Sequence, residues 1–153
     1  KAREYGFHTS MIESSMMIND KMPAYCVERA GKILNRFRKS LNGSRVLVLG
    51  VAYKQDIDDY RESPALRVIE ELEKTGADVI YYDPWVRQYR FKGQEHVSEP
   101  ELTEELIESA DLVMITAAHT NVDYELVQRH AKAVFDTKNV MKNIENRENI
   151  EVL

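Results

Sequence analysis

Cysteine is almost absent from this chain, since Cys26 is the only one. An internal disulfide framework is therefore excluded, and a reducing compartment such as the cytoplasm is favoured. No apolar run approaches the roughly 20 residues that a membrane-spanning helix needs, and no signal peptide is evident. The formal net charge of -5 argues against a sequence-independent nucleic-acid surface. Any anion-binding site must therefore come from a local arrangement of lysine and arginine side chains.

The dinucleotide fingerprint GxGxxG is also missing, because Ala52 stands where a second glycine would follow Gly50. Asp83 ends a later apolar run, where an acidic residue of a dinucleotide site would contact ribose. It lies well beyond the roughly 20-residue spacing of that fingerprint and precedes Pro84, so we interpret it as a turn residue.

Short apolar runs do alternate with amphipathic segments along the chain. The runs predict buried strands, and the segments between them predict helices. This alternation favours an α/β domain at 41–153, with a Rossmann-like parallel sheet and helices on both of its faces. We expect residues 86–99 to be irregular. The predicted strands are 46–49, 79–82, 112–116 and 133–135, and the predicted helices begin at Pro64, Glu101 and Asp123.

A methionine-rich amphipathic pattern over 10–39 predicts a long helix ahead of this domain, within a helical segment at 1–40. Pro23 removes one helix hydrogen bond and should kink or restart the helix. Its apolar seam packs either against a partner, such as a second subunit or a further domain, or against its own domain. Cys26 lies on that seam and is expected to be a buried small residue, not a nucleophile. Because the chain starts without Met inside a helical pattern, we expect a piece of a longer protein.

The stretch VLVLGVAYKQDIDDYRESP at 46–64 is the most informative part of the sequence. It consists of a buried strand, a glycine, a long charged loop and a helix start, with Ser63 as N-cap and Pro64 at the first helical position. Ordinary strand-to-helix loops have roughly 2–6 residues, so the segment 51–62 is unusually long. Such loops bind ligands in open α/β sheets, which makes phosphate or nucleotide binding the leading hypothesis.

Carboxylates cluster in this loop and could in principle bind Mg²⁺ or Ca²⁺. Their spacing is not that of an EF-hand, so we expect them to order the loop and orient Lys54 and Arg61, without a metal. The histidines show no ligand spacing, and His119 is expected in a turn or capping role, with approach to a ligand as the alternative. The acidic residues are Asp56, Asp58, Asp59 and Glu62, and the histidines are His8, His96, His119 and His130.

Several motifs, in order and spacing, resemble the C-terminal domain of the UDP-glucose/GDP-mannose dehydrogenase family. The resemblance spans nearly the whole chain, and the earlier pattern Ile18-Asn19 with Met22-Pro23 resembles the family's central dimerisation helix. The form DIDDYRESPAL is most similar to members that act on UDP-N-acetylhexosamines. The motifs are GVAYK at 50–54, DIDDYRESP at 56–64, GA at 76–77, YDP at 82–84 and FDTKN at 135–139.

The resemblance implies an NAD-dependent oxidoreductase that converts C6 of a nucleotide sugar to a uronic acid, supplying polysaccharide precursors. The family's NAD domain and catalytic cysteine are not in this sequence. We therefore expect the UDP-sugar-binding part of such an enzyme, dimeric through its helix and inactive by itself. The pattern is compatible with UDP or GDP, and with glucose or an N-acetylated hexosamine.

The resemblance also implies roles for four side chains. Tyr53 and Lys54 contact the nucleotide sugar, and Arg61 reaches NAD held by the other domain. Lys138 replaces the arginine of the family's D-T-R-N turn, which contacts substrate, often from the neighbouring subunit. Lysine keeps that charge but loses the bidentate fork. The plainer interpretations are solvated lysines, a tyrosine that covers the core, and an arginine paired with a nearby carboxylate.

Two other functions are compatible with the sequence. One is an assembly module that dimerises through residues 10–39 and binds little nucleotide, which the lysine at 138 favours. The other is a flavodoxin- or receiver-like signalling domain, to which acidic residues after strand ends are suited. The charged loop ending in Arg-Glu-Ser-Pro and the lack of a phosphoacceptor context argue against the second.

Overall fold

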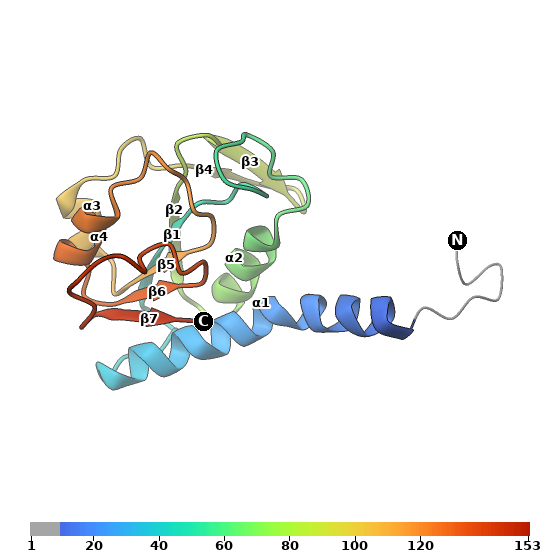
Figure 1. Ribbon diagram of the computed structural model, residues 1–153, viewed down its shortest axis with the longest axis horizontal. Coiled ribbons are helices and arrows are strands. Elements are labelled where there is room, and N and C mark those ends of the chain that lie inside the picture. Colours follow the sequence, from blue (N-terminus) through green and yellow to red (C-terminus); the bar gives the residue numbers. More distant parts are fainter. Residues whose placement is uncertain (1–9) are drawn as a thin grey trace.

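The computed structural model describes residues 10–153, and a five-stranded parallel sheet with one long helix dominates it (Figure 1). His8 and the first part of the expected segment 1–40 lie outside the described residues. The elements are α1 (Ser10–Arg36), β1 (Arg45–Leu49), α2 (Pro64–Lys74), β2 (Asp78–Tyr82), β3 (Gln88–Phe91), β4 (Gln94–Val97), α3 (Glu104–Ser109), β5 (Leu112–Ile115), α4 (Tyr124–His130), β6 (Val134–Asp136) and β7 (Ile150–Val152).

The main sheet has the strand order β2-β1-β5-β6-β7, and every neighbouring pair is parallel. The central strands are apolar and buried on both faces, which is the pattern of a sheet covered by helices on both sides. After β1 the chain forms β2 on one side of it, and later returns to form β5 on the other side. The strand order therefore reverses between β1 and β5, where open α/β sheets hold their ligands.

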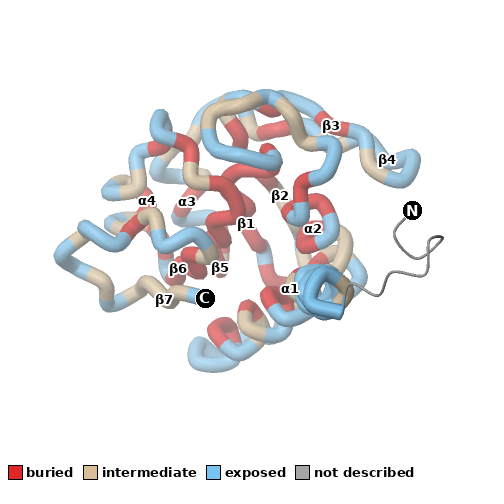
Figure 2. The backbone as a smooth tube through the Cα atoms, turned by 45° about the vertical axis from the view of Figure 1, so that its right-hand side comes forward, coloured by how far each residue is buried: buried red, intermediate tan, exposed pale blue. Residues whose placement is uncertain are grey.

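Two separate apolar clusters cover the two faces of the sheet. Val48, Met114 and Phe135 point toward α1 and α2, whereas Leu49 and Ile115 point toward α3 and α4. Figure 2 shows buried positions concentrated along the strands and on the part of α1 that lies against them. The predicted Rossmann-like fold with helices on both faces is confirmed.

The helix α1 runs without interruption through Pro23. Of the two expected effects of this proline, a restart of the helix is therefore wrong, and a kink stays a prediction. From Pro23 onward, one side of α1 is buried against the sheet, and the Arg29 guanidinium donates to the Glu151 carboxylate of β7 at 2.8 Å. Ahead of Pro23 the helix extends past the sheet (Figure 1) and exposes a series of large apolar side chains. These are Met11, Ile12, Met16, Met17 and Ile18.

Cys26 is buried on α1, as expected for a small core residue. Burial raises the pKa of its thiol, and the charges of Lys138 and Arg29 only partly oppose that rise. Within residues 10–153, no helix combines the length and apolar character needed to cross a membrane.

The helix α3 begins at Glu104, later than the predicted start at Glu101, and three strands were not predicted. Residues expected to be irregular form the antiparallel β3–β4 hairpin, whose turn residues Lys92 and Gly93 both have positive φ, at 48° and 87°. Two-residue hairpin turns of this kind favour Asn-Gly, so Lys-Gly gave no clear signal. The strand β7 was not predicted, because it is a three-residue segment with Glu151 at its centre that acquires its strand character by pairing with β6.

Candidate functional site

The loops after β1 and β5 meet at the point where the strand order reverses. Gly50 begins the first loop with φ at +85°, and a Cβ added there would lie 2.5 Å from the Cβ of Ala117. A glycine is required here because the second loop packs directly on the end of β1. Ser63 ends the first loop as the N-cap of α2 and accepts a hydrogen bond from the Ala65 amide, as the sequence predicted.

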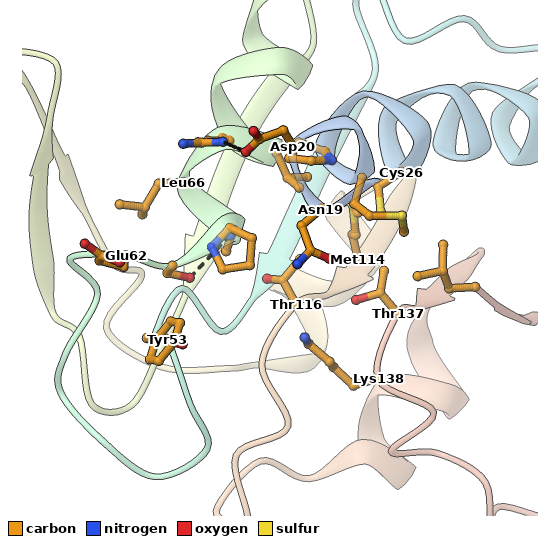
Figure 3. A pocket seen from close by; sticks show the side chains of 18 of the residues that line it. Asn19, Asp20, Cys26, Tyr53, Glu62, Leu66, Met114, Thr116, Thr137 and Lys138 are labelled. Atoms are coloured by element: carbon orange, nitrogen blue, oxygen red, sulfur yellow. Dashed lines mark hydrogen bonds and ion pairs between the residues drawn. The ribbon is translucent and has the colours of Figure 1, made fainter. Parts of the chain in front are cut away.

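A cleft of about 670 Å³ opens on the α1 and α2 side of this edge (Figure 3). One wall is apolar, with Met22 and Pro23 from α1 and Leu66 from α2. Thr116, Thr137 and Lys138 lie where β5 and β6 end, and Figure 3 shows the Lys138 side chain extending toward the cleft. A concave site with apolar walls and a few converging polar groups has the character of a small-ligand site.

Three of the four predicted site residues line this cleft, namely Tyr53, Arg61 and Lys138. Tyr53 is half exposed, so its ring does not simply cover the core. Lys54 is not among the lining residues, and its ammonium lies 5.4 Å from the centroid of the Tyr53 ring. The structure therefore brings tyrosine, arginine and one lysine together and places the second lysine just beside them.

Arg61 is paired within its own loop. Its Nε and Nη2 each donate to the Asp59 carboxylate at 3.0 Å, while the guanidinium stays largely exposed. The Arg61 side chain is the main reason that the pKa of Asp59 falls to about 2. Pairing with a nearby carboxylate was the plainer interpretation of Arg61, and the pair leaves one face of the guanidinium open to solvent.

Asp56 connects the two loops at the sheet edge. Its carboxylate accepts hydrogen bonds from the Thr120 amide and hydroxyl, both at 2.9 Å, and these help to lower its pKa, with the Thr120 amide as the largest cause. Thus two carboxylates of the acidic cluster order the loop, Asp56 across to Thr120 and Asp59 on to Arg61. Within residues 10–153, no group of three or more potential ligands is arranged to hold a metal ion.

Asp83 has a larger part than the turn residue that the sequence indicated. It is fully buried, and its Oδ2 accepts from the amides of Val51 at 2.7 Å and Ala52 at 3.0 Å. Its Oδ1 accepts from the amides of Trp85 and Val86, which is the predicted turn. Burial alone would raise the pKa of this carboxyl, but hydrogen bonds from a buried imidazole and from these turn amides outweigh it and lower the pKa.

The imidazole is that of His119, whose Nε2 lies 3.1 Å from Asp83 Oδ2 and whose side chain is completely buried. Sequence reasoning placed His119 in a turn and missed this contact. The only available signal was position, since both residues follow the ends of strands that lie on either side of β1. Parallel strands bring such residues to one edge of the sheet.

Further residues of α1 also line the cleft. Asn19 and Cys26 line it, and Asp20 receives a hydrogen bond of 3.0 Å from the Arg67 guanidinium of α2. Figure 3 shows Asn19 between the two helices and the strand ends. The long helix is therefore a component of the site as well as an extension of the fold.

Comparisons with known proteins agree with this geometry. Residues 47–143 match the UDP binding domain of the UDP-glucose/GDP-mannose dehydrogenase family. A UDP-N-acetyl-D-mannosamine dehydrogenase of Methanocaldococcus jannaschii is 32% identical over 142 residues, which cover 88% of this chain and 30% of that protein. A UDP-glucose 6-dehydrogenase of Haloferax volcanii is 39% identical over 83 residues, covering 54% of this chain and 18% of that protein.

Among solved structures, the UDP-D-ManNAc dehydrogenase from Pyrococcus horikoshii superposes with a TM-score of 0.78 at 26% identity. The match covers 95% of this chain and 34% of that one. The chain thus spans about a third of the length of the relatives that it matches along most of its own length.

Proposed function

Because this chain belongs to the UDP-glucose/GDP-mannose dehydrogenase family, we propose that it holds the nucleotide of a UDP-sugar for an NAD-dependent 6-dehydrogenase. The observation that supports this most directly is the cleft at the strand ends. It brings Tyr53 and Lys138, from the loops after two different strands, to the rim of an apolar hollow. Aromatic, cationic and apolar surfaces together suit a base, a pyrophosphate and a sugar.

We assign the pyrophosphate to the ammonium groups of Lys54 and Lys138, and we place the Tyr53 ring against the ligand. Lys54 lies beside the cleft, with its ammonium 5.4 Å from the centroid of the Tyr53 ring, and we propose that it reaches the pyrophosphate from there. Binding energy from the nucleotide, far from the reacting carbon, orients C6 for oxidation elsewhere in the enzyme. We therefore expect this 153-residue chain alone to bind UDP without reducing NAD.

The described residues do not form a dinucleotide site of their own. The space beside Gly50 is filled by Ala117, so a pyrophosphate cannot approach the backbone there. Asp83 is buried and fully hydrogen-bonded, so it cannot contact a ribose. We assign NAD binding mainly to another domain of the enzyme. The Arg61 guanidinium suits a pyrophosphate or a carboxamide oxygen, and we expect the part of it that its pair with Asp59 leaves exposed to reach the NAD.

We propose a UDP-N-acetylhexosamine as the sugar nucleotide, with UDP-glucose as the alternative. Two relatives that are at least 30% identical over most of this chain are UDP-N-acetyl-D-mannosamine dehydrogenases, which supports the first choice. A UDP-glucose dehydrogenase structure from Pyrobaculum islandicum also aligns with 99% of this chain, at 25% identity, which keeps UDP-glucose as the alternative. The product would be the corresponding uronic acid, a precursor for surface polysaccharides made in the cytoplasm. The single buried thiol is suited to that reducing compartment.

A homodimer through α1 is the assembly we propose. The part of α1 ahead of Pro23 exposes Met11, Ile12 and Met16, which a second copy of the helix would cover. A series of large exposed apolar side chains of this kind is typical of an interaction surface.

The test is calorimetric titration of the chain with UDP and with GDP. We expect selective UDP binding, weakened about 10-fold or more in Lys54→Ala and in Lys138→Ala, because each variant removes one cation that pairs with phosphate. Lys142→Ala is the matched control, since that exposed lysine does not line the cleft. Failure to bind either nucleotide, together with a stable dimer, would favour an assembly module instead.

A further inference from the structure

The buried His119 ring can adopt only one hydrogen-bonding arrangement. The Asp56 amide donates to its Nδ1 at 2.9 Å, so Nδ1 must accept and carries no proton. The ring proton is then on Nε2, which lies 3.1 Å from a carboxylate oxygen of Asp83 that can accept it. The ring is thus a neutral bridge between a backbone amide of one loop and a buried carboxylate below it.

The backbone amide that donates to His119 is that of Asp56, whose backbone has a positive φ. Asp56 has φ at 59°, in the left-handed region that costs residues with a side chain free energy. Its amide is held by His119 and its carboxylate by Thr120, so both ends of the residue are fixed to the loop after β5. Without these contacts, the backbone at Asp56 would relax toward an ordinary conformation and the loop would change its path.

The same loop carries the side chains proposed to bind ligand. The Tyr53 amide donates to the Asp59 carbonyl at 2.7 Å, which closes the loop around Asp56. Asp59 in turn holds Arg61. The start of the loop is held by the other member of the pair, since the Val51 and Ala52 amides donate to the same Asp83 oxygen that faces His119. A single buried pair therefore fixes both the start and the middle of the loop.

We propose that His119 is a positioning residue that, through Asp83 below it and the Asp56 amide above it, holds loop 51–63 in its nucleotide-binding conformation. This inference rests on the proposed function, because the value of the ordered loop lies in the ligand it receives. His119 itself need not touch the ligand, and it does not line the cleft. Its effect on binding would come entirely through the placement of Tyr53 and Lys54.

Two amide variants separate the two sides of the ring. In His119→Asn, the side-chain amide oxygen lies near the position of Nδ1, so an acceptor for the Asp56 amide is kept. In His119→Gln, the side-chain amide reaches the position of Nε2, so a partner for Asp83 is kept. The Asp56 amide is then left without an acceptor. His130→Asn and His130→Gln are the matched controls, because His130 pairs with Glu108 of α3, away from the loop.

We would measure three quantities on this chain. Long-range proton–nitrogen NMR of the wild type should show His119 protonated on Nε2 only. Amide exchange should be about 3- to 10-fold faster at Asp56 in His119→Gln than in His119→Asn, as expected when one hydrogen bond is lost. UDP affinity should fall by a similar factor in His119→Gln, remain close to the wild-type value in His119→Asn, and be unchanged in both controls.

The proposal is overturned if NMR finds the proton on Nδ1, or if both variants fold and match the wild type in Asp56 exchange and UDP affinity. Failure of the wild type to bind UDP would overturn the proposed function instead. In that case the exchange comparison, which needs no ligand, still decides whether His119 holds the loop.

Discussion

The Arg61 guanidinium and the Asp59 carboxylate form a two-pronged ion pair, with Nε and Nη2 donating to the two carboxylate oxygens. The pair lies on the rim of the cleft and is open to solvent on one side. It ties the Arg61 side chain to its own loop before any ligand arrives. An arginine fixed in this way loses less conformational freedom when it meets an anion.

This pair should be visible in the titration of Asp59. Its pKa is about 2 in the folded chain, and in Arg61→Ala it should return toward the ordinary value of about 3.9. Because the folded-state pKa is depressed, the pair stabilises the fold fully above about pH 4 and loses that effect as pH falls toward 2. Carboxyl carbon NMR measures this directly. Arg67→Ala, which breaks a different surface pair, should leave the Asp59 pKa where it is.

Asp83→Asn should be among the most destabilising single changes at the sheet edge. The carboxylate accepts from four amides and from His119, and an asparagine would turn a donor toward some of these donors. We expect a loss of about 3 kcal/mol in the free energy of unfolding, measured by urea denaturation. Asp78→Asn, whose half-exposed carboxylate pairs with Arg45, should cost less than about 1 kcal/mol. Similar losses in the two variants would contradict the role given to Asp83.

Gly50→Ala should destabilise the fold more than Gly93→Ala does. Both glycines have positive φ, so both substitutions carry backbone strain. Only at Gly50 would the new methyl meet Ala117, whereas nothing lies within 4 Å at Gly93. The difference between the two variants in thermal or urea unfolding should be about 1–3 kcal/mol, the usual cost of overpacking. Equal losses would mean that the second loop can move away from the end of β1.

Lys138→Arg should bind UDP about 3- to 10-fold more tightly than the wild type. The lysine ammonium is a single point charge, and an arginine would offer a planar fork that matches two phosphate oxygens. Calorimetry with UDP measures the change, and Lys142→Arg controls for a general effect of arginine. Unchanged affinity would indicate that the group at 138 does not face the phosphates.

Met16→Glu should shift the chain from dimer to monomer in analytical ultracentrifugation. The substitution places a charge in the exposed apolar series of α1, where a second helix would have to bury it. Ser14→Glu tests the other side of α1, because its helical spacing places it opposite Ile12 and Met16 and beside Met17 and Ile18. A larger effect of Met16→Glu would assign the interface to the side that carries Ile12 and Met16. A monomeric wild type, or dimers that survive in Met16→Glu, would rule out this surface as the interface.

The parts of the fold specified locally were predictable from the sequence. The run at 46–49 and the Ser63-Pro64 helix start carry strong signals, and both lie where they were expected. The β3–β4 hairpin was not predictable, because a lysine occupies a left-handed turn position there. The strand β7 acquires its pairing from β6, which is distant in sequence, so residues 150–152 alone did not indicate it.

The same distinction holds for the site. Tyr53, Arg61 and Lys138 were predicted from motifs, and the cleft brings them together, although their roles in binding stay predictions. The contact of Asp83 with His119 was missed, because the two residues are far apart in sequence and each alone resembles an ordinary turn residue. Only the order of the strands shows that they meet.

The helix α1 both lines the cleft and carries the surface that we propose for dimerisation. Its 27 residues extend for about 40 Å, with one half packed on the sheet and the other half exposed, where we propose that a second copy binds. The middle of the rod, at Asn19 to Cys26, is a wall of the cleft. A second copy that tilted the exposed half, as in the proposed dimer, would therefore alter the width of the cleft, and a nucleotide bound in the cleft would in turn affect the tilt. If both proposals hold, self-association and ligand affinity would be linked thermodynamically through α1, and each would change when the other is perturbed.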